Sequence, residues 1–302
     1  MVHVVAGGSG YLGGHLVERL LSRGEEVVVI DRYPPRSGAR YVEHDLKEPL
    51  SLDIEGPRIY HFAANPDVKA TMESVRSRCE EELKATLNLA ELARMTDATL
   101  LVYISSPAVY GDAQTPTPET APLRPISYHG LYKSLSEGII DFYGRNYGIR
   151  SLIVRMTNVA GGRMSHGVIA DFFRRLRSNP EELEVYGDGG QGRSYLYIDD
   201  ALGALELLEE AGAEGIYNAG NDDWVSVSEI AEAVSSSMGL RPRIRYNRCV
   251  IDAKEALGGG GWPGDIRIVF PDSTKLKSLG WRPSMRSKEV VGRAVEDLLR
   301  GR

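Results

Sequence analysis

The sequence has few cysteines and no spacing that would let them act together. Cys79 and Cys249 are the only two, and they lie far apart in the chain. A structural zinc site needs closely spaced cysteines or histidines, and neither residue has such a neighbour. We therefore expect two reduced thiols and no metal site.

Long apolar runs and an excess of positive charge are also absent. No segment of roughly 18 unbroken apolar residues occurs, and the first residues, MVHVVAGG, lead into a β-branched run instead of a signal peptide. We therefore expect no membrane association and a cytoplasmic protein. The 36 lysines and arginines are outnumbered by 42 aspartates and glutamates, for a net charge of -6. This balance leaves no broad basic face, so we do not expect a nucleic-acid partner.

The remaining composition is that of a globular protein. Of the 302 residues, 42% are hydrophobic and 26% are charged. Helix-period segments alternate with five apolar, strand-like runs, at 2–6, 27–30, 58–63, 99–104 and 151–155. The clearest helical segments lie at 14–23 and 80–94. This alternation predicts an α/β fold with a Rossmann-type, doubly wound parallel sheet in the first half of the chain.

After about residue 160 the pattern becomes shorter and more broken. We expect a helix at 168–177, a strand at 194–198, a helix at 199–211 and a strand at 215–220. The sequence S-V-S-E at 226–229 is a capping box that predicts another helix. The glycine run at 258–261 predicts a loop, and two terminal helices should start near Asp272 and Arg286. Together these elements predict a smaller, mixed α/β carboxy-terminal lobe.

Three glycines connect the first strand to the first helix. In G-G-S-G-Y-L-G, residues 7–13, Gly7, Gly10 and Gly13 allow a tight turn and let a pyrophosphate approach the amino end of the helix. Asp31 ends the second strand, where a carboxylate can bind an adenosine ribose and repel a 2′-phosphate. Arg32 would offset part of that repulsion. The pattern favours NAD over NADP, and the alternative is a turn that only eases helix packing.

Further motifs follow in a fixed order, namely HDL at 44–46, HFAAN at 61–65, SSPAVYG at 105–111, R-x-x-N at 155–158 and GDGGQGRSYLYIDD at 187–200. With the glycine motif, they resemble the extended short-chain dehydrogenases/reductases, and among them the archaeal-type UDP-galactose (UDP-glucose) 4-epimerases. The resemblance implies bound NAD, a UDP-hexose substrate and a homodimer formed through the helix carrying Lys133 and the helix at 80–94. The implied NAD contacts are Gly7, Gly10, Tyr11, Leu12, Gly13, Asp31, Asp45, Leu46, Phe62, Ala63, Ala64 and Lys133.

The resemblance also divides the chain by function. It implies an NAD-binding domain at 1–158, to which elements near 193–222 return, and a substrate-binding lobe at 159–192 and 223–302. The residues implied to hold or flank the nucleotide diphosphate are Asn158, His166, Gln191, Arg193 and Tyr195. A lone histidine such as His166 is more often structural than catalytic. For Arg193 the alternative is a surface ion pair with Asp188 or Asp199.

The catalytic segment departs from the family at one residue. Family members oxidise C4 of the sugar and return the hydride to the opposite face, and a tyrosinate beside a lysine takes the O4 proton. The two residues are spaced Y-x-x-x-K, but in S-Y-H-G-L-Y-K, residues 127–133, that spacing joins His129 to Lys133. Ser106 matches the hydroxyl of the proton relay, and its alternative role is to cap the end of a strand. The resemblance therefore assigns catalysis to Ser106, His129 and Lys133.

Neighbouring tyrosines do not replace the missing one in a regular helix. Tyr128 precedes Lys133 by five residues, about 140° around the helix, and Tyr132 is the immediate neighbour of the lysine. A neutral imidazole is a capable base, but when His129 accepts a proton it becomes a second cation beside Lys133. Its nitrogen also does not lie where a phenol oxygen would. We therefore expect slow epimerisation or a different reaction.

Other substitutions also set the chain apart from the family. Glu82 stands where the family has asparagine, Gly162 stands where proline is common, and the stretch around Trp262 lacks a frequent arginine. Two alternatives therefore stay open, an impaired protein that binds NAD and a nucleotide sugar, and a dehydrogenase or reductase that releases the keto product. Pro107 and Ala108 stand where dehydratases carry an acidic pair, which argues against 4,6-dehydratase chemistry.

Overall fold

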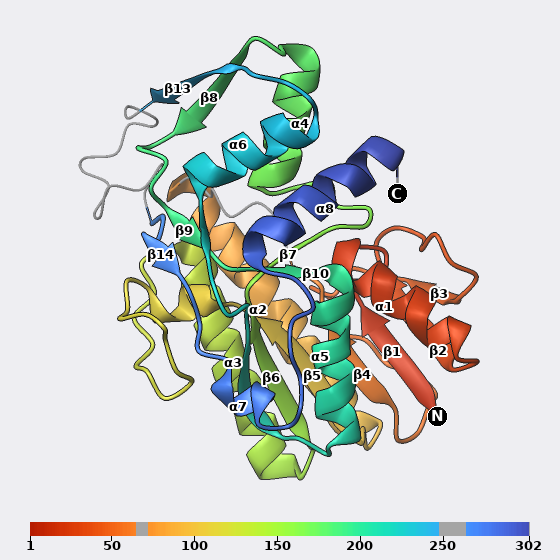
Figure 1. The fold of residues 1–302 in the computed structure, drawn as a ribbon. Helices are drawn as coiled ribbons and strands as arrows, with labels where there is room; N and C mark the ends of the chain where they lie inside the picture. The colour runs from red at the N-terminus through yellow and green to blue at the C-terminus, as the bar shows by residue number, and fades with distance from the viewer. Residues whose placement is uncertain (65–71, 248–263, 302) are drawn as a thin grey trace. The chain divides into compact units, whose positions relative to one another are not determined.

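The computed structural model describes residues 1–64, 72–247 and 264–301 (Figure 1). Asn65, Cys249, the glycine run at 258–261 and Trp262 lie outside these ranges. The described chain forms two compact units. Unit 1 comprises Met1–Ser106, Leu131–Arg155 and Leu208–Tyr217, and unit 2 comprises Pro107–Gly130, Met156–Leu207 and Asn218–Arg302, each with the gaps just given.

A seven-stranded sheet forms the centre of unit 1. Its strands are β1 (Val2–Ala6), β2 (Glu26–Asp31), β3 (Arg40–Glu43), β4 (Arg58–His61), β5 (Leu100–Ser105), β6 (Ser151–Met156) and β11 (Gly215–Ala219). Their order is β11-β6-β5-β4-β1-β2-β3, and the pairs from β6 to β3 are parallel. The predicted doubly wound sheet and its five apolar runs are confirmed. The edge strand β3 was not predicted, because its four residues, RYVE, carry no apolar run.

Three helices of this region return the chain between parallel strands. They are α1 (Tyr11–Ser22), α2 (Met72–Met95) and α3 (Tyr128–Tyr147). Helix α1 packs on β1 and β2, and α2 packs on β4 and β5. Leu89 of α2 and Ile140 of α3 belong to one buried cluster with Ile59 and Ile153 of the strands, so α2 and α3 cover the same face of the sheet.

Two helix starts differ from the prediction. Helix α1 begins at Tyr11 and not at Gly14, because Gly10 is its N-cap and the glycine motif itself supplies the first turn. Helix α2 begins at Met72 and not at residue 80. Its first turns, MESVRSRC, carry charged and small residues without an apolar period, so the sequence pattern is weak there.

Unit 2 combines short strands with a group of three helices. Helices α4 (Val168–Ser178), α6 (Val227–Ser237) and α8 (Ser287–Arg300) pack against one another (Figure 1). The first residues of α3, up to Gly130, also belong to this unit. The other elements that begin in it are η1 (Pro107–Tyr110), β7 (Asn158–Ala160), β8 (Glu182–Tyr186), β9 (Gly192–Arg193), β10 (Tyr195–Tyr197), α5 (Ile198–Glu210), β12 (Val225–Ser226), β13 (Arg243–Asn247), β14 (Ile268–Val269) and α7 (Thr274–Lys277). In small sheets β7 pairs with β10, β8 pairs with β13, and β9 lies between β12 and β14.

Local signals predicted most of the longer elements of unit 2. The capping box forms as expected, since the Ser226 hydroxyl accepts from Glu229 N at 3.2 Å and the Glu229 carboxylate accepts from Ser226 N at 2.8 Å. Of the two terminal helices, α8 is confirmed, whereas α7 is a single turn. In the ranges that the structure describes, every helix is too short or too polar to cross a bilayer.

Candidate active site

The glycine motif forms the turn between β1 and α1. Gly7 has a φ of +79°, and its amide donates to Ile30 O at 2.9 Å. A Cβ on Gly13 would lie 2.3 Å from Gly7 O, and one on Gly7 would lie 2.5 Å from Ala63 N, so neither position accepts a side chain. A Cβ on Gly10, the N-cap of α1, would meet only Gly7 O, at 3.2 Å. The turn therefore presents the amino end of α1 to an anion.

The other implied NAD contacts follow the carboxyl ends of neighbouring strands. Asp31 ends β2, and its carboxylate accepts from Ser9 N at 3.1 Å and from Tyr33 N at 3.2 Å. Phe62 follows β4, and its amide donates to Ala6 O at 2.9 Å. The remaining contacts lie in the first turn of α1, after β3 and after β4; they are Tyr11, Leu12, Asp45, Leu46, Ala63 and Ala64. An anion-binding helix end beside a fixed carboxylate fits the pyrophosphate and the adenosine ribose of NAD.

Lys133 is buried at the carboxyl end of β5, with 6% of its surface exposed. Its ammonium donates to Ile104 O at 2.7 Å and lies 4.7 Å from the centre of the Tyr103 ring. Burial lowers the pKa of Lys133 to about 8, and the negative charges of Glu82 and Glu137 oppose that shift. The lysine therefore still carries a positive charge at pH 7. Ser106, half-buried, follows the end of the same strand.

A buried ion pair lies next to this lysine. Arg155 of β6 donates to both carboxylate oxygens of Glu137, at 2.9 and 2.7 Å, and the two side chains are 2% and 4% exposed. The Ser105 hydroxyl also donates to Glu137. Arg155 belongs to the R-x-x-N motif, whereas Glu137 and Ser105 were not predicted as site residues. The sequence spacing could have indicated Glu137, because it follows Lys133 by four residues and therefore lies on the same face of α3.

Polar side chains join α2 to α3 above the sheet. The Thr86 hydroxyl lies 3.0 Å from the Ser136 hydroxyl and 3.0 Å from His61 Nε2. Burial, aided by the charge of Lys133, lowers the pKa of His61 to about 3. His61 therefore stays neutral across the physiological range, and it supports the packing of α2 on the sheet.

The start of α3 sets the geometry of the segment predicted to be catalytic. The Ser127 hydroxyl accepts from Gly130 N at 3.1 Å, as an N-cap does, and the helix is regular from Tyr128 onward. Tyr128 therefore lies about 140° around the helix from Lys133. His129, half-buried, precedes Lys133 by one helical turn and lies on its side of the helix by register.

Arg193 of β9 has a partner that the sequence analysis did not foresee. It forms an ion pair with Asp265, and the two side chains are 16% and 6% exposed. The expected alternative, a surface pair with Asp188 or Asp199, is wrong, and Asp188 binds Arg267 at 2.7 Å instead. The physical reason is strand pairing, because β14 runs parallel to β9 and brings the segment after residue 264 alongside it.

The other implied substrate residues are distributed over unit 2. Asn158 and Tyr195 are register partners in the β7–β10 pair, so the structure brings them together. Asn158 is exposed, whereas Tyr195 is buried and burial raises its pKa. Gln191 is 2% exposed, and among the described residues its Oε1 has no hydrogen-bond partner. His166 is exposed in the segment before α4.

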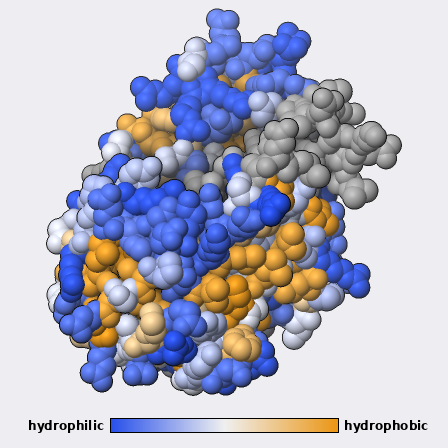
Figure 2. Space-filling view, turned by 180° about the vertical axis from the view of Figure 1, so that it is seen from behind, coloured by the Kyte–Doolittle hydropathy of each residue, from blue (hydrophilic) through white to orange (hydrophobic). Residues whose placement is uncertain are grey.

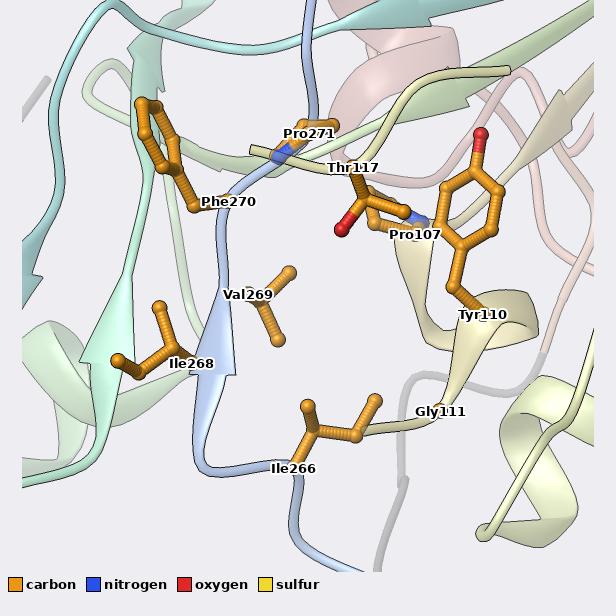
Figure 3. Close-up of a pocket in the computed structure, with 9 residues that line it drawn as sticks. All are labelled: Pro107, Tyr110, Gly111, Thr117, Ile266, Ile268, Val269, Phe270 and Pro271. Atoms are coloured by element: carbon orange, nitrogen blue, oxygen red, sulfur yellow. The ribbon is translucent and has the colours of Figure 1, made fainter. Parts of the chain in front are cut away.

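A cavity of about 10 Å³ lies within unit 2, between η1 and the segment around β14 (Figure 3). Its walls come from apolar side chains such as Ile266, Val269 and Phe270 together with Pro107 and Tyr110. This volume is close to that of a single water probe, so the cavity does not hold a sugar. Its walls instead fix the segment that carries Asp265, since Thr117 N donates to Phe270 O at 3.0 Å.

The parallel sheet, the glycine turn and Asp31 define a Rossmann-type dinucleotide-binding protein. The chain belongs to the NAD dependent epimerase/dehydratase family, whose sequence profile matches residues 3–220. It uses NAD as its cofactor, as the glycine turn and Asp31 predicted.

Individual proteins similar to this chain show which activities occur among its relatives. A solved UDP-galactose 4-epimerase is 39% identical, with a TM-score of 0.86 and 99% of each chain covered. The UDP-glucose 4-epimerase of Thermus thermophilus, solved with NAD, is 30% identical, with a TM-score of 0.83 and 99% of each chain covered. UDP-glucuronic acid decarboxylase 1 of Arabidopsis thaliana is 30% identical over 97% of this chain and 69% of its own length. The relatives thus share a nucleotide-sugar substrate class but not a single reaction.

Proposed function

We propose that this protein catalyses NAD-dependent epimerisation at C4 of a UDP-hexose, with UDP-galactose and UDP-glucose as the two substrates. The observation that carries the proposal is the buried Lys133 ammonium at the end of β5, one helical turn after His129, on a unit whose glycine turn fits NAD. Similarity to solved UDP-galactose and UDP-glucose 4-epimerases supports the same substrate class.

The proposed chemistry needs a base at the sugar O4 and a cation beside it. The glycine turn and Asp31 would hold NAD, which would supply reversible hydride chemistry at C4 of the sugar. His129 takes the O4 proton as the hydride leaves and gives it back to the same oxygen at the end. Lys133 stabilises negative charge that develops on O4, and the Ser106 hydroxyl relays the proton. The net reaction inverts C4 and leaves the cofactor unchanged.

We propose that the diphosphate of the substrate binds to unit 2. Arg193 offers the fork of donors that suits paired phosphate contacts, and Asn158, Gln191 and Tyr195 offer amide and hydroxyl groups. His166 lies in the loop before α4 and contributes to shape rather than to chemistry. Because Arg193 is held by Asp265, a phosphate meets a guanidinium that is already oriented.

The proposal is tested by incubating the NAD-loaded protein with UDP-galactose and separating the products. The expected result is UDP-glucose with no net change in NADH absorbance, and a mixture of the same composition when the reaction starts from UDP-glucose. Accumulation of NADH and a keto sugar would instead show a dehydrogenase. Release of carbon dioxide from UDP-glucuronate, with no epimerisation, would place the chain with its decarboxylase relatives. Binding of both NAD and UDP-galactose without turnover would identify the impaired alternative.

We also propose a homodimer formed through α2 and α3. Several large apolar side chains on these two helices are 39–50% exposed, among them Leu87, Met95, Leu131, Leu135 and Phe142. Apolar surface gathers in the lower half of the view from behind, the side on which α2 and α3 cover the sheet (Figure 2). An apolar face of this kind is typical of a protein–protein interface, and the family resemblance implies a second copy as its occupant.

A charge placed in this face should break the dimer. The variant Leu135→Glu is expected to elute as a monomer in size-exclusion chromatography with light scattering at micromolar concentration, because a dimer would bury the new carboxylate. The control is Leu299→Glu on α8, since Leu299 is 55% exposed but lies outside this face. A monomeric parent protein, or equal masses for the parent and both variants, would contradict the proposed interface.

A further inference from the structure

Two buried carboxylates act on Lys133, and one of them is already bound to another cation. Glu137 is engaged by the guanidinium of Arg155 through two hydrogen bonds and by the Ser105 hydroxyl. Glu82 on α2 is 7% exposed, and its negative charge acts on Lys133. Arg155 compensates the charge of Glu137, and of the two carboxylates Glu82 has the larger effect on Lys133.

The packing of the two helices explains why Glu82 lies there. Helices α2 and α3 each return between parallel strands, so they run in the same direction. They meet at Thr86 and Ser136, whose hydroxyl oxygens are 3.0 Å apart. Glu82 lies one turn before Thr86, whose hydroxyl donates to its carbonyl, and Lys133 lies almost one turn before Ser136. Both side chains therefore project from the same level of two neighbouring helices.

We propose that Glu82 is the counterion of Lys133 and that its charge lets His129 serve as the base in place of a phenolate. The inference rests on the proposed function and deepens it. A phenolate and a lysine pass from a net charge of 0 to +1 when the phenolate takes a proton. Neutral His129, Lys133 and ionised Glu82 also pass from 0 to +1. The charge of Glu82 thus offsets the repulsion between Lys133 and a protonated His129.

The other charged and titratable groups near Lys133 do not act as its counterion. His61 of β4 is neutral, the pKa of Tyr103 is raised by burial so that its phenol stays protonated, and Arg155 is bound to Glu137. Tyr132 of α3 lies beside Tyr103 and is itself buried. Among the described residues, the groups shown to act on Lys133 are His61, Glu82, Tyr103 and Glu137, and His129 lies one turn before it on α3.

The test measures the titration of Lys133 directly. Lysine side chains are labelled with ¹³C in the NAD-bound protein, the Lys133 signal is assigned from its loss in Lys133→Arg, and its pKa is compared between the parent and Glu82→Gln. We expect the pKa of Lys133 to fall by about one unit or more. The matched control is Glu81→Gln. Glu81 is the neighbouring acid on α2 and is 46% exposed, so its replacement should leave the pKa of Lys133 unchanged. An unchanged or raised pKa in Glu82→Gln would overturn the inference.

A second measurement separates a charge effect from a loss of structure. In the parent, Glu82→Gln should lower turnover about tenfold, because His129 then forms a second cation with no compensating anion. In a His129→Tyr background the same change should raise turnover, since Glu82 competes with the phenolate for Lys133. If Glu82→Gln changed turnover in the same direction in both backgrounds, the inference would be wrong. If UDP-galactose is not a substrate, the proposed function fails, yet the NMR titration still decides whether Glu82 is the counterion.

Discussion

Replacement of Arg155 by methionine is expected to lower the free energy of unfolding by about 3–5 kcal/mol. The arginine and Glu137 are almost wholly buried and share two hydrogen bonds, so the single substitution leaves a carboxylate in the interior without its cation. Methionine fills a similar length, so lost volume contributes little. Chemical denaturation followed by circular dichroism measures the change as a shift of the midpoint at constant slope.

Two controls make that result specific to the buried charge. Arg145→Met removes an exposed pair with Asp141, whose side chains are 72% and 52% exposed, and should cost no more than about 0.5 kcal/mol. The double variant Arg155→Met with Glu137→Met should recover a large part of the loss, because both charges are then gone. If Arg155→Met is no less stable than Arg145→Met, the buried pair does not hold α3 to β6.

The substitution His129→Tyr is expected to raise turnover of UDP-galactose about 100-fold at pH 8. A phenol at this position, one turn before Lys133, would ionise beside the ammonium and place its oxygen farther along the side chain than an imidazole nitrogen. A displacement of a catalytic group by about 1 Å is enough to change rates by this factor. The initial rate of UDP-glucose formation is the measurement, with NAD occupancy matched between the two proteins.

The control for this substitution is Tyr128→Phe. Because α3 is regular from Tyr128 onward, that phenol points away from Lys133, and its removal should leave the parent rate unchanged. A large loss in Tyr128→Phe would show that the neighbouring tyrosine acts as the base. Equal rates for the parent and His129→Tyr would show that the imidazole is already positioned as well as a phenolate would be.

Much of unit 1 was predictable because its signals are local in the sequence. Strands covered on both faces must be apolar throughout, which is why the runs at 2–6 and 99–104 mark β1 and β5. Glycines are required wherever the chain closes on itself, so Gly7 and Gly13 marked the dinucleotide turn. Elements without such a signal were missed or misplaced, as with β3 and the polar first turns of α2.

The sequence by itself determined the family, the cofactor and the order of His129 and Lys133 on one helix, because these depend on residues that are close in the chain. Only the tertiary structure decided which charges meet. Arg155 finds Glu137 across 18 residues, and Arg193 finds Asp265 across 72. Glu82 reaches the level of Lys133 only because α2 and α3 pack in parallel. These charge pairs depend on how elements distant in the sequence pack. A buried charge without a partner is costly, so it pairs with an opposite charge that the fold brings close to it.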